Sequence, residues 1–371
     1  MRIINSAILA VAQVMWLNCG ALRLAADDRL RLELLAEVPE ATGLDPAGDC
    51  TISPDGSRVA IGCGSNPVKG GFSRGGVMIW SVADKRFIHT FRAHADCVWA
   101  LAFSPDGNVL ASGGDDTVCL WDMKSGKLLT TLRGWTGPVL SIDIDSGGKW
   151  LAASCGKKPG KPPYPKSHVG VYDLRTFERS AALSDDRTDL RCVKFSPDGS
   201  KLAVSAESVE DNMSAPSEIV LWDLATKRPW KQLRGHKSGV PSLDFSRDGK
   251  SLFSVGQHDV TTTSFGKGDL RSWSIADASP ASKELLTLGY TASVVSCGHK
   301  KTWLAVAYHK KSATDPVDSS EVAIYDYNSM RVIHRLGGLR SVSQVRFSKD
   351  CTRLVVSDNR RHFVYSIVEA K

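Results

Sequence analysis

The stretch that decides the fold is Val98–Asp122, which reads VWALAFSPDGNVLASGGDDTVCLWD. An apolar run with alternation ends in the turn SPDG (Ser104–Gly107), whose proline presets φ and whose glycine accepts a positive φ. A second apolar run follows, then a turn with two aspartates and a β-branched run at Thr117–Trp121. Two tight turns leave no room for a helix, so the stretch predicts a three-stranded antiparallel meander, and Leu128–Leu132 predicts a fourth strand.

This pattern recurs along the chain. SPDG or a weaker copy of it stands at seven places: Ser53–Gly56, Ser104–Gly107, Ser146–Lys149, Ser196–Gly199, Ser246–Gly249, Gly298–Lys301 and Ser348–Cys351. An aromatic marker of the third strand recurs in phase with it: Trp80, Trp121, Tyr172, Trp222, Trp273, Tyr325 and Tyr365. The period of roughly 40 to 50 residues is that of propeller blades.

The phased series resembles the WD40-repeat family over about Arg29 to Lys371. The resemblance implies an all-β fold, a seven-bladed β-propeller of four-stranded antiparallel blades, in one domain covering residues 29–371. The last blade lacks an outer strand, and in WD40 propellers an N-terminal segment supplies it. By pattern alone Leu30–Val38 fits a helix or a strand, but ring closure favours an N-terminal strand that pairs with the last blade.

Residues 1–26 differ in composition from the rest of the chain. Arg2 precedes an apolar run at Ala7–Leu17, and two small residues precede Asp27. This is the layout of a secretory signal peptide, whereas the run is short for a membrane span. We therefore expect an exported protein, periplasmic or extracellular, if 1–26 is a signal peptide, with a cytoplasmic protein as the alternative.

The composition gives no indication of a cofactor, a metal site or catalysis. Nine cysteines fall mostly in predicted strands of different blades, without CxxC or Cys/His spacing, which favours small apolar residues in a reduced core. The nine histidines show no repeated spacing to an acid, and nothing resembles a phosphate-binding glycine loop or a nucleophile elbow. The net charge of +7 permits an acidic partner without demanding one.

One set of residues in blade two could suggest a nucleophilic triad: His94, Ser112, Asp116 and Trp121. In WD40 blades the matching positions form a buried chain of hydrogen bonds, so the resemblance implies a structural network. The match is imperfect, because one residue is missing between Asp116 and Thr117. Blade five offers a second network of His236, Ser254 and Trp273, with Asp259 as its candidate acid.

Candidate partner-binding residues come from the long loops and the first strands. The loops between second and third strands lie on one face in the WD40 arrangement, and such insertions often mark the binding face. Aligning the first strands places Trp99 and Arg191 near the mouth of the central channel, and both are residue types that anchor interfaces. The basic loops and two nearby aromatic residues complete the set: Trp135, Lys157, Lys158, Lys161, Tyr164, Lys166, Arg360 and Arg361.

We therefore expect a non-enzymatic scaffold that binds a protein or peptide on the loop-rich face, with an acidic partner compatible with the lysines. The alternative is a propeller enzyme or small-ligand binder that uses the channel mouth. Nucleic-acid binding is disfavoured, because the five long loops sum to about zero charge whereas nucleic acids require dense phosphate neutralisation. We expect a monomer unless the partner assembles it, without a membrane span.

Overall fold

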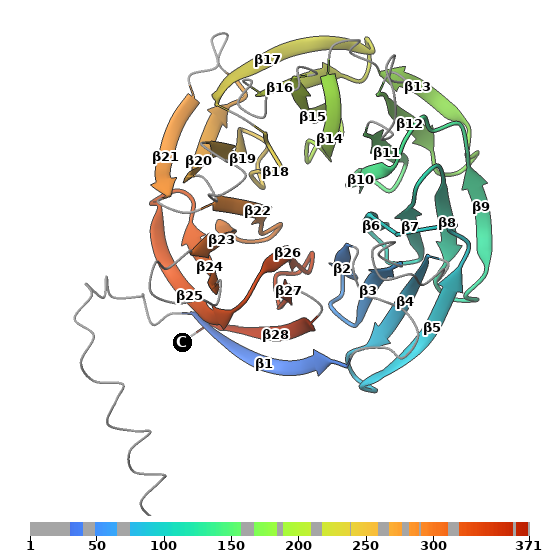
Figure 1. The fold of residues 1–371 in the computed structure, drawn as a ribbon, viewed down its shortest axis with the longest axis horizontal. Coiled ribbons are helices and arrows are strands. Elements are labelled where there is room, and N and C mark those ends of the chain that lie inside the picture. Colours follow the sequence, from blue (N-terminus) through green and yellow to red (C-terminus); the bar gives the residue numbers. More distant parts are fainter. Residues whose placement is uncertain are drawn as a thin grey trace, which may run out of the picture.

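The computed structural model shows a closed ring of seven β-sheets around a central axis (Figure 1). It describes residues 30–39, 49–64, 75–156, 167–183, 188–208, 217–237, 239–258, 267–276, 282–288, 291–310, 319–358 and 361–369. Within these ranges every regular element is a β-strand, and each sheet has four strands in antiparallel order. The predicted seven-bladed propeller is confirmed.

Six blades each consist of four consecutive strands, the first lying at the centre and the fourth at the perimeter (Figure 1). Blade one contains β2 (Cys50–Ile52), β3 (Arg58–Cys63), β4 (Gly76–Ser81) and β5 (Arg86–Arg92). Blade two contains β6 (Ala100–Phe103), β7 (Val109–Gly113), β8 (Val118–Asp122) and β9 (Leu128–Leu132). Blade three contains β10 (Val139–Ile144), β11 (Trp150–Cys155), β12 (Val169–Asp173) and β13 (Arg179–Leu183).

The next three blades follow the same order. Blade four contains β14 (Thr188–Phe195), β15 (Lys201–Ser208), β16 (Ser217–Asp223) and β17 (Arg228–His236). Blade five contains β18 (Ser242–Phe245), β19 (Ser251–His258), β20 (Lys267–Ser274) and β21 (Ser282–Leu288). Blade six contains β22 (Thr291–Cys297), β23 (Trp303–Lys310), β24 (Ser319–Asp326) and β25 (Arg331–Leu339).

Blade seven joins the two ends of the described chain. It contains β26 (Val342–Phe347), β27 (Arg353–Asp358) and β28 (Arg361–Glu369), and its outer strand is β1 (Leu30–Val38). The β1–β28 pair runs antiparallel from Leu30 opposite Glu369 to Val38 opposite His362. The expected closure by an N-terminal strand is therefore confirmed.

The hydrophobic core is divided among the seams between blades. Each of seven buried clusters draws its residues from two neighbouring blades. Leu30, at one end of β1, belongs to the cluster between blades six and seven, whereas Val38, at the other end, belongs to the cluster between blades seven and one. A blade thus buries its faces only against its neighbours, and β1 contributes to two seams.

The SPDG turns hold the first two strands of a blade together. In blade two Ser104 Oγ donates to Asp106 Oδ1 at 2.6 Å and accepts the Val109 N–H at 2.9 Å, while Gly107 has a φ of +71°. Blade three departs from the sequence prediction, because its turn begins at Asp145 and not at Ser146: the Gly148 N–H donates to the Asp145 carbonyl at 2.9 Å. The Asp145 carboxylate takes the place of the serine hydroxyl.

The ends of the chain are only partly described. Residues 1–26, on which the expectation of a signal peptide rests, lie outside the described residues, so that expectation stays a prediction. Among the described residues no helix has the length and apolar character needed to cross a bilayer.

Ring closure predicts a large loss of stability when β1 is removed. A truncation that starts at Asp45 should lower the melting temperature and the solubility, because burial of Leu30 and Val38 alone contributes about 3 to 6 kcal/mol and the β28 edge becomes exposed. A matched truncation starting at Asp28 keeps β1 and should melt like the parent. Equal melting of the two truncations in calorimetry would contradict the assignment of β1 as the closing strand.

Candidate functional site

A cavity of about 550 Å³ lies along the axis of the ring and is lined by first strands of all seven blades. The first strands all end in the SPDG-type turns, so one mouth of the cavity lies where these strands begin and the other lies at the turns. We call these the loop-side mouth, at Trp99 and Arg191, and the turn-side mouth, at Arg247, His299 and Lys349. The lining carries five arginines and lysines against three aspartates.

The structure brings two predicted residues to the loop-side mouth. Trp99 precedes β6, and 42% of its surface is exposed. This is unusual, because tryptophan side chains are on average largely buried. Arg191 lies in β14, is exposed and lines the same cavity. The mouth therefore presents an aromatic face from blade two and a guanidinium group from blade four.

The surroundings of Trp99 are acidic. Its Nε1–H donates to Asp115 Oδ1 at 3.5 Å. Burial raises the pKa of Asp115, and the neighbouring carboxylate of Asp96 raises it further. Asp116 adds another negative charge. A negative potential next to an exposed indole ring favours a cationic group over that ring.

Trp135, predicted as a partner-binding residue, is instead part of the core of blade three. It is 7% exposed and stacks on His168 with ring centroids 5.2 Å apart and planes 5° apart. Its Nε1–H donates to the Leu132 carbonyl at 3.3 Å. The ring fills the place that a histidine occupies in blades two and five, so it is not available to a partner.

The remaining predicted contacts are mostly outside the described residues: Lys157, Lys158, Lys161, Tyr164, Lys166 and Arg360. Arg361 is described and lies in β28. Its guanidinium forms an ion pair with Asp358 and lies over the Phe363 ring, 5.1 Å from the centroid. Arg361 is thus held within blade seven and does not line the cavity.

Blade five contains a complete buried network. His236 Nδ1 lies 2.8 Å from Asp269 Oδ1, and His236 Nε2 lies 2.7 Å from Ser254 Oγ. Trp273 Nε1–H donates to the same serine hydroxyl at 2.7 Å. The acid is Asp269 and not the expected Asp259, which lies outside the described residues. Counting back four residues from the third-strand tryptophan would have found Asp269 in the sequence.

Blade two has the same network with one substitution. His94 Nε2 lies 2.8 Å from Ser112 Oγ, which accepts the Trp121 Nε1–H at 2.9 Å. The expected acid, Asp116, is exposed, and Thr117 Oγ1 lies 3.2 Å from His94 Nδ1 in its place. The missing residue between Asp116 and Thr117 shifts the threonine into the network position, four residues before the tryptophan.

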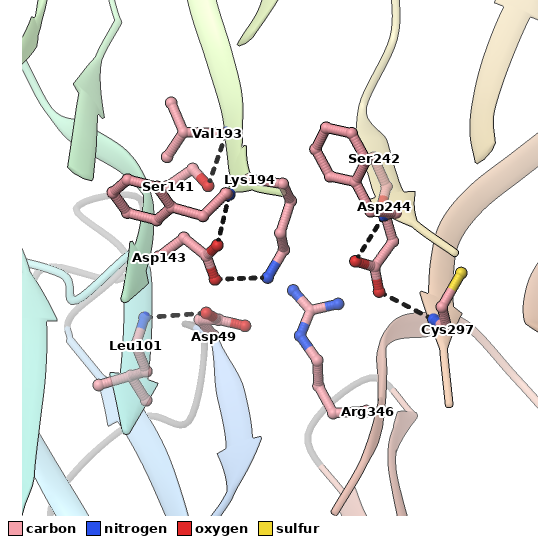
Figure 2. Close-up of polar contacts among 12 residues, drawn as sticks. Asp49, Leu101, Ser141, Asp143, Val193, Lys194, Ser242, Asp244, Cys297 and Arg346 are labelled. Carbon is pink, nitrogen blue, oxygen red and sulfur yellow. Dashed lines mark hydrogen bonds and ion pairs between the residues drawn. The ribbon is translucent and has the colours of Figure 1, made fainter. Parts of the chain in front are cut away.

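Three aspartates in the channel connect neighbouring blades, and sequence reasoning missed them (Figure 2). Asp49 accepts the Leu101 N–H at 2.9 Å, Asp143 accepts the Phe195 N–H at 2.8 Å, and Asp244 accepts the Cys297 N–H at 2.8 Å. Each carboxylate bonds the backbone of the first strand of the next blade. The bridges fall between blades one and two, three and four, and five and six.

Two cations extend into the channel among these carboxylates. Lys194 of β14 pairs with Asp143 at 2.8 Å, and Arg346 of β26 projects from blade seven toward Lys194 (Figure 2). Both cations stand two residues before the turn that ends their strand, a sequence position at which Asp143 and Asp244 also occur. The described residues contain no group of histidine, cysteine and acidic side chains that could hold a metal ion.

A family model described as "WD domain, G-beta repeat" matches residues 85–122, 126–158 and 227–260. The first and third of these segments run from the outer strand of one blade into the next blade and contain the histidines of the two buried networks. Together with the seven four-stranded blades, these matches are consistent with the WD40-repeat family of β-propellers.

Curated relatives share this repeat at low identity. Nuclear distribution protein PAC1 of Arthroderma otae is 28% identical over 200 residues, covering 53% of this chain and 39% of the relative. The periodic tryptophan protein 2 homolog of Caenorhabditis elegans is 23% identical over 336 residues, covering 85% and 32%. The matched part of the chain thus spans less than half the length of these relatives.

Solved structures show the same fold. The chain is similar to Kuenenia stuttgartiensis hydrazine synthase with a TM-score of 0.67 and 16% identity, over 89% of this chain and 97% of that one. It is also similar to the Myceliophteria thermophila Cps50 (Swd1) β-propeller domain with a TM-score of 0.66 and 13% identity, over 91% and 99%. At these identities the likeness concerns the fold alone.

The two buried networks predict that substitutions at Asp116, Thr117 and Asp269 lower the free energy of unfolding by different amounts. Asp116→Ala should change the free energy of unfolding by less than about 0.5 kcal/mol, because its side chain is exposed. Thr117→Val should cost about 1 kcal/mol by removing a buried hydrogen bond. Asp269→Ala should cost about 3 kcal/mol or more, because it removes the buried carboxylate that contacts both His236 and Arg271, although Arg271 keeps its ion pair with Glu284. Denaturant titration measures all three, and an equal cost for Asp116→Ala and Thr117→Val would contradict the assignment.

Two buried histidines predict a loss of stability in acid. Burial lowers the pKa of both His94 and His362 from 6.5 to about 4, and His362 Nε2 has no hydrogen-bond partner among the described residues. Between pH 6.5 and 4 the unfolded chain therefore binds protons that the folded chain excludes, so the free energy of unfolding falls as the pH falls.

The variant His362→Phe isolates one of these contributions. Its free energy of unfolding should fall less steeply than that of the parent between pH 6.5 and 4, the difference amounting to about 3 kcal/mol over the window. Urea titrations at a series of pH values provide the measurement. Parallel pH profiles for parent and variant would show that His362 is not a buried neutral imidazole.

Proposed function

We propose that the protein is an interaction scaffold whose loop-side mouth binds a segment of a partner protein. The single observation that carries the proposal is the exposed Trp99 ring beside the cavity, with Arg191 of blade four lining the same cavity. Tryptophan and arginine are enriched among residues that dominate binding energy. The WD40-repeat relatives support the same class of function, because their names describe nuclear distribution proteins and not enzymes.

The charges at the mouth define the segment more closely. Asp96 and Asp115 surround Trp99 on blade two, whereas Arg191 supplies a cation on blade four. A segment that places a lysine or arginine over Trp99 and an acidic residue against Arg191 matches this arrangement. A wholly acidic peptide, the expectation from the lysine-rich loop, would place negative charge next to Asp115.

The alternative of catalysis receives less support from the channel. The one histidine among the described lining residues, His299, lies at the turn-side mouth, and Cys192 has its pKa raised by burial, which leaves its thiol protonated. The hydrazine synthase likeness concerns the fold alone. These observations favour binding over a reaction in the channel.

The eight cysteines of the described residues form no disulfide, and seven are buried. Buried thiols that form no disulfide are typical of a reducing compartment. Together with relatives named for nuclear distribution, they favour the cytoplasmic alternative over export. We propose a scaffold in that compartment that is a monomer unless its partner assembles it.

Affinity capture tests the loop-side mouth. The tagged parent and the variants Trp99→Ala, Arg191→Ala and Trp230→Ala should be used as bait in extracts of the native cells, with mass spectrometry of the captured proteins. Trp230 is a matched control, because it is also 42% exposed but lies on the outer strand β17. Proteins captured by the parent and by Trp230→Ala should be lost from the other two baits.

The binding kinetics of one captured partner then show how much Trp99 and Arg191 each contribute to the affinity. Trp99→Ala and Arg191→Ala should each raise the dissociation rate, at a cost of about 2 kcal/mol in affinity, with little change in the association rate. Surface plasmon resonance measures both rates. A partner that dissociates from all three variants as slowly as from the parent binds elsewhere on the propeller and overturns the proposed site.

A further inference from the structure

The turn-side half of the channel differs from the loop side in its charge. Lys194 from blade four and Arg346 from blade seven point toward one another across the axis (Figure 2). Two like charges facing each other in a partly desolvated cavity repel, so the arrangement costs free energy unless negative groups lie between them. Three aspartates lie nearby. Burial and the charge of Arg346 lower the pKa of Lys194, but Asp143 and Asp244 outweigh them and raise it overall, so these carboxylates stabilise the lysine cation.

The oxygens of the three aspartates are largely used by the protein itself. Asp49 accepts the N–H groups of Cys50 and Leu101, both at 2.9 Å. Asp244 accepts those of Phe245 at 3.0 Å and Cys297 at 2.8 Å. Asp143 accepts the Phe195 N–H and the Lys194 ammonium group, both at 2.8 Å. All six oxygens thus have a donor from the backbone or from Lys194.

Arg346 differs from Lys194 because its guanidinium group is not paired with a carboxylate in the described part of the chain. Its NH1 donates to the Val345 carbonyl at 3.3 Å, and among the described residues it forms no ion pair within 4.0 Å. Its charge does act on Asp49, where burial raises the carboxyl pKa and Arg346 opposes that rise. A guanidinium group has five N–H donors in a planar fork, so most of those of Arg346 face the cavity.

The turn-side mouth adds positive charge above this pair. Arg247, His299 and Lys349, at matching positions of blades five, six and seven, line the cavity and are exposed. Prolines occupy the matching positions of blades one, two and four: Pro54, Pro105 and Pro197. The acids of the same turns do not line the cavity, because their carboxylates bond the turn serines, as Asp248 bonds Ser246 at 2.7 Å.

We propose that the turn-side half of the channel binds a small molecule carrying at least two oxyanion groups. Arg346 and Lys194 hold one group inside the channel, and Arg247 and Lys349 hold the other at the rim, with His299 beside them. A guanidinium fork binds carboxylate or phosphate oxygens in a bidentate manner, which fits either chemistry. The cavity volume of about 550 Å³ is in the range of small-molecule sites.

This site is separate from the proposed protein-binding mouth. Trp99 and Arg191 stand where the first strands begin, whereas the rim cations stand on the turns where those strands end. A small polyanion and a partner segment would therefore enter from opposite faces. The two proposals can be tested independently, because the variants that test them change different residues.

Isothermal titration calorimetry on the full chain tests the anion site with three probes: pyrophosphate, inorganic phosphate and citrate. Pyrophosphate and citrate distinguish a phosphate ligand from a carboxylate ligand, and inorganic phosphate tests the need for a second anionic group. We expect saturable binding of pyrophosphate or citrate that is at least about tenfold tighter than that of inorganic phosphate, because the second anionic group adds a charged contact.

Variants assign the binding to the channel. Arg346→Gln should weaken binding of the better probe at least about tenfold, and Arg346→Lys, which keeps the charge without the fork, should lie between it and the parent. Arg247→Gln and Lys349→Gln should each weaken it a few-fold. Lys127→Gln removes an exposed lysine from a turn of blade two that does not line the cavity, and should bind like the parent.

Three results would overturn the proposal. The first is that no probe binds at millimolar concentration to the folded parent, as judged by its melting transition. The second is that Lys127→Gln weakens binding as much as Arg346→Gln does, which would show a general response to net charge. The third is that Arg346→Gln binds the better probe as tightly as the parent while Arg247→Gln does not, which would confine binding to the exposed rim.

Discussion

The antiparallel pairing of β1 with β28 is the constraint on which the rest of the structure depends. No blade can bury both faces of its sheet alone, so the core is shared among seven seams, and an open ring would leave a seam without its second wall. Leu30 and Val38 show how directly the closure supports the core, because one strand places a buried residue in each of two seams. The central channel has a fixed shape only because this ring is closed.

Closure also explains why the channel can hold opposite charges at close range. The three aspartates that bridge neighbouring first strands use backbone N–H groups as partners, so hydrogen bonds offset part of the cost of their desolvation. Lys194 is part of this arrangement through Asp143, whereas Arg346 lies outside it. One set of inner strands therefore supplies both the connections between blades and a cation that has donors left for a ligand.

Most of the fold can be predicted from the phased repeats, because the SPDG turns and the third-strand aromatic residues are local features that recur in each blade. The closing strand followed from topology, since Leu30–Val38 fits helix or strand by pattern. Side-chain roles were less accessible: Trp135 has an interface residue type yet occupies a histidine position in the core, and Thr117 replaces Asp116 because one residue is missing. Asp49, Lys194 and Arg346 lie in different blades, and only the closed ring places them together.

The separation of the two mouths limits how a scaffold of this kind can be regulated. Arg346 lies four residues, about 13 Å, from the loop-side end of β26, which is more than the distance over which exposed charges act at physiological salt. The first strands are hydrogen-bonded to their own blades and, through the aspartates, to the next blade. A ligand at Arg346 should therefore add stability to the ring by mass action and leave the geometry at Trp99 unchanged. The two faces of one rigid ring can thus bind two ligands of different chemistry with little coupling free energy between the two sites.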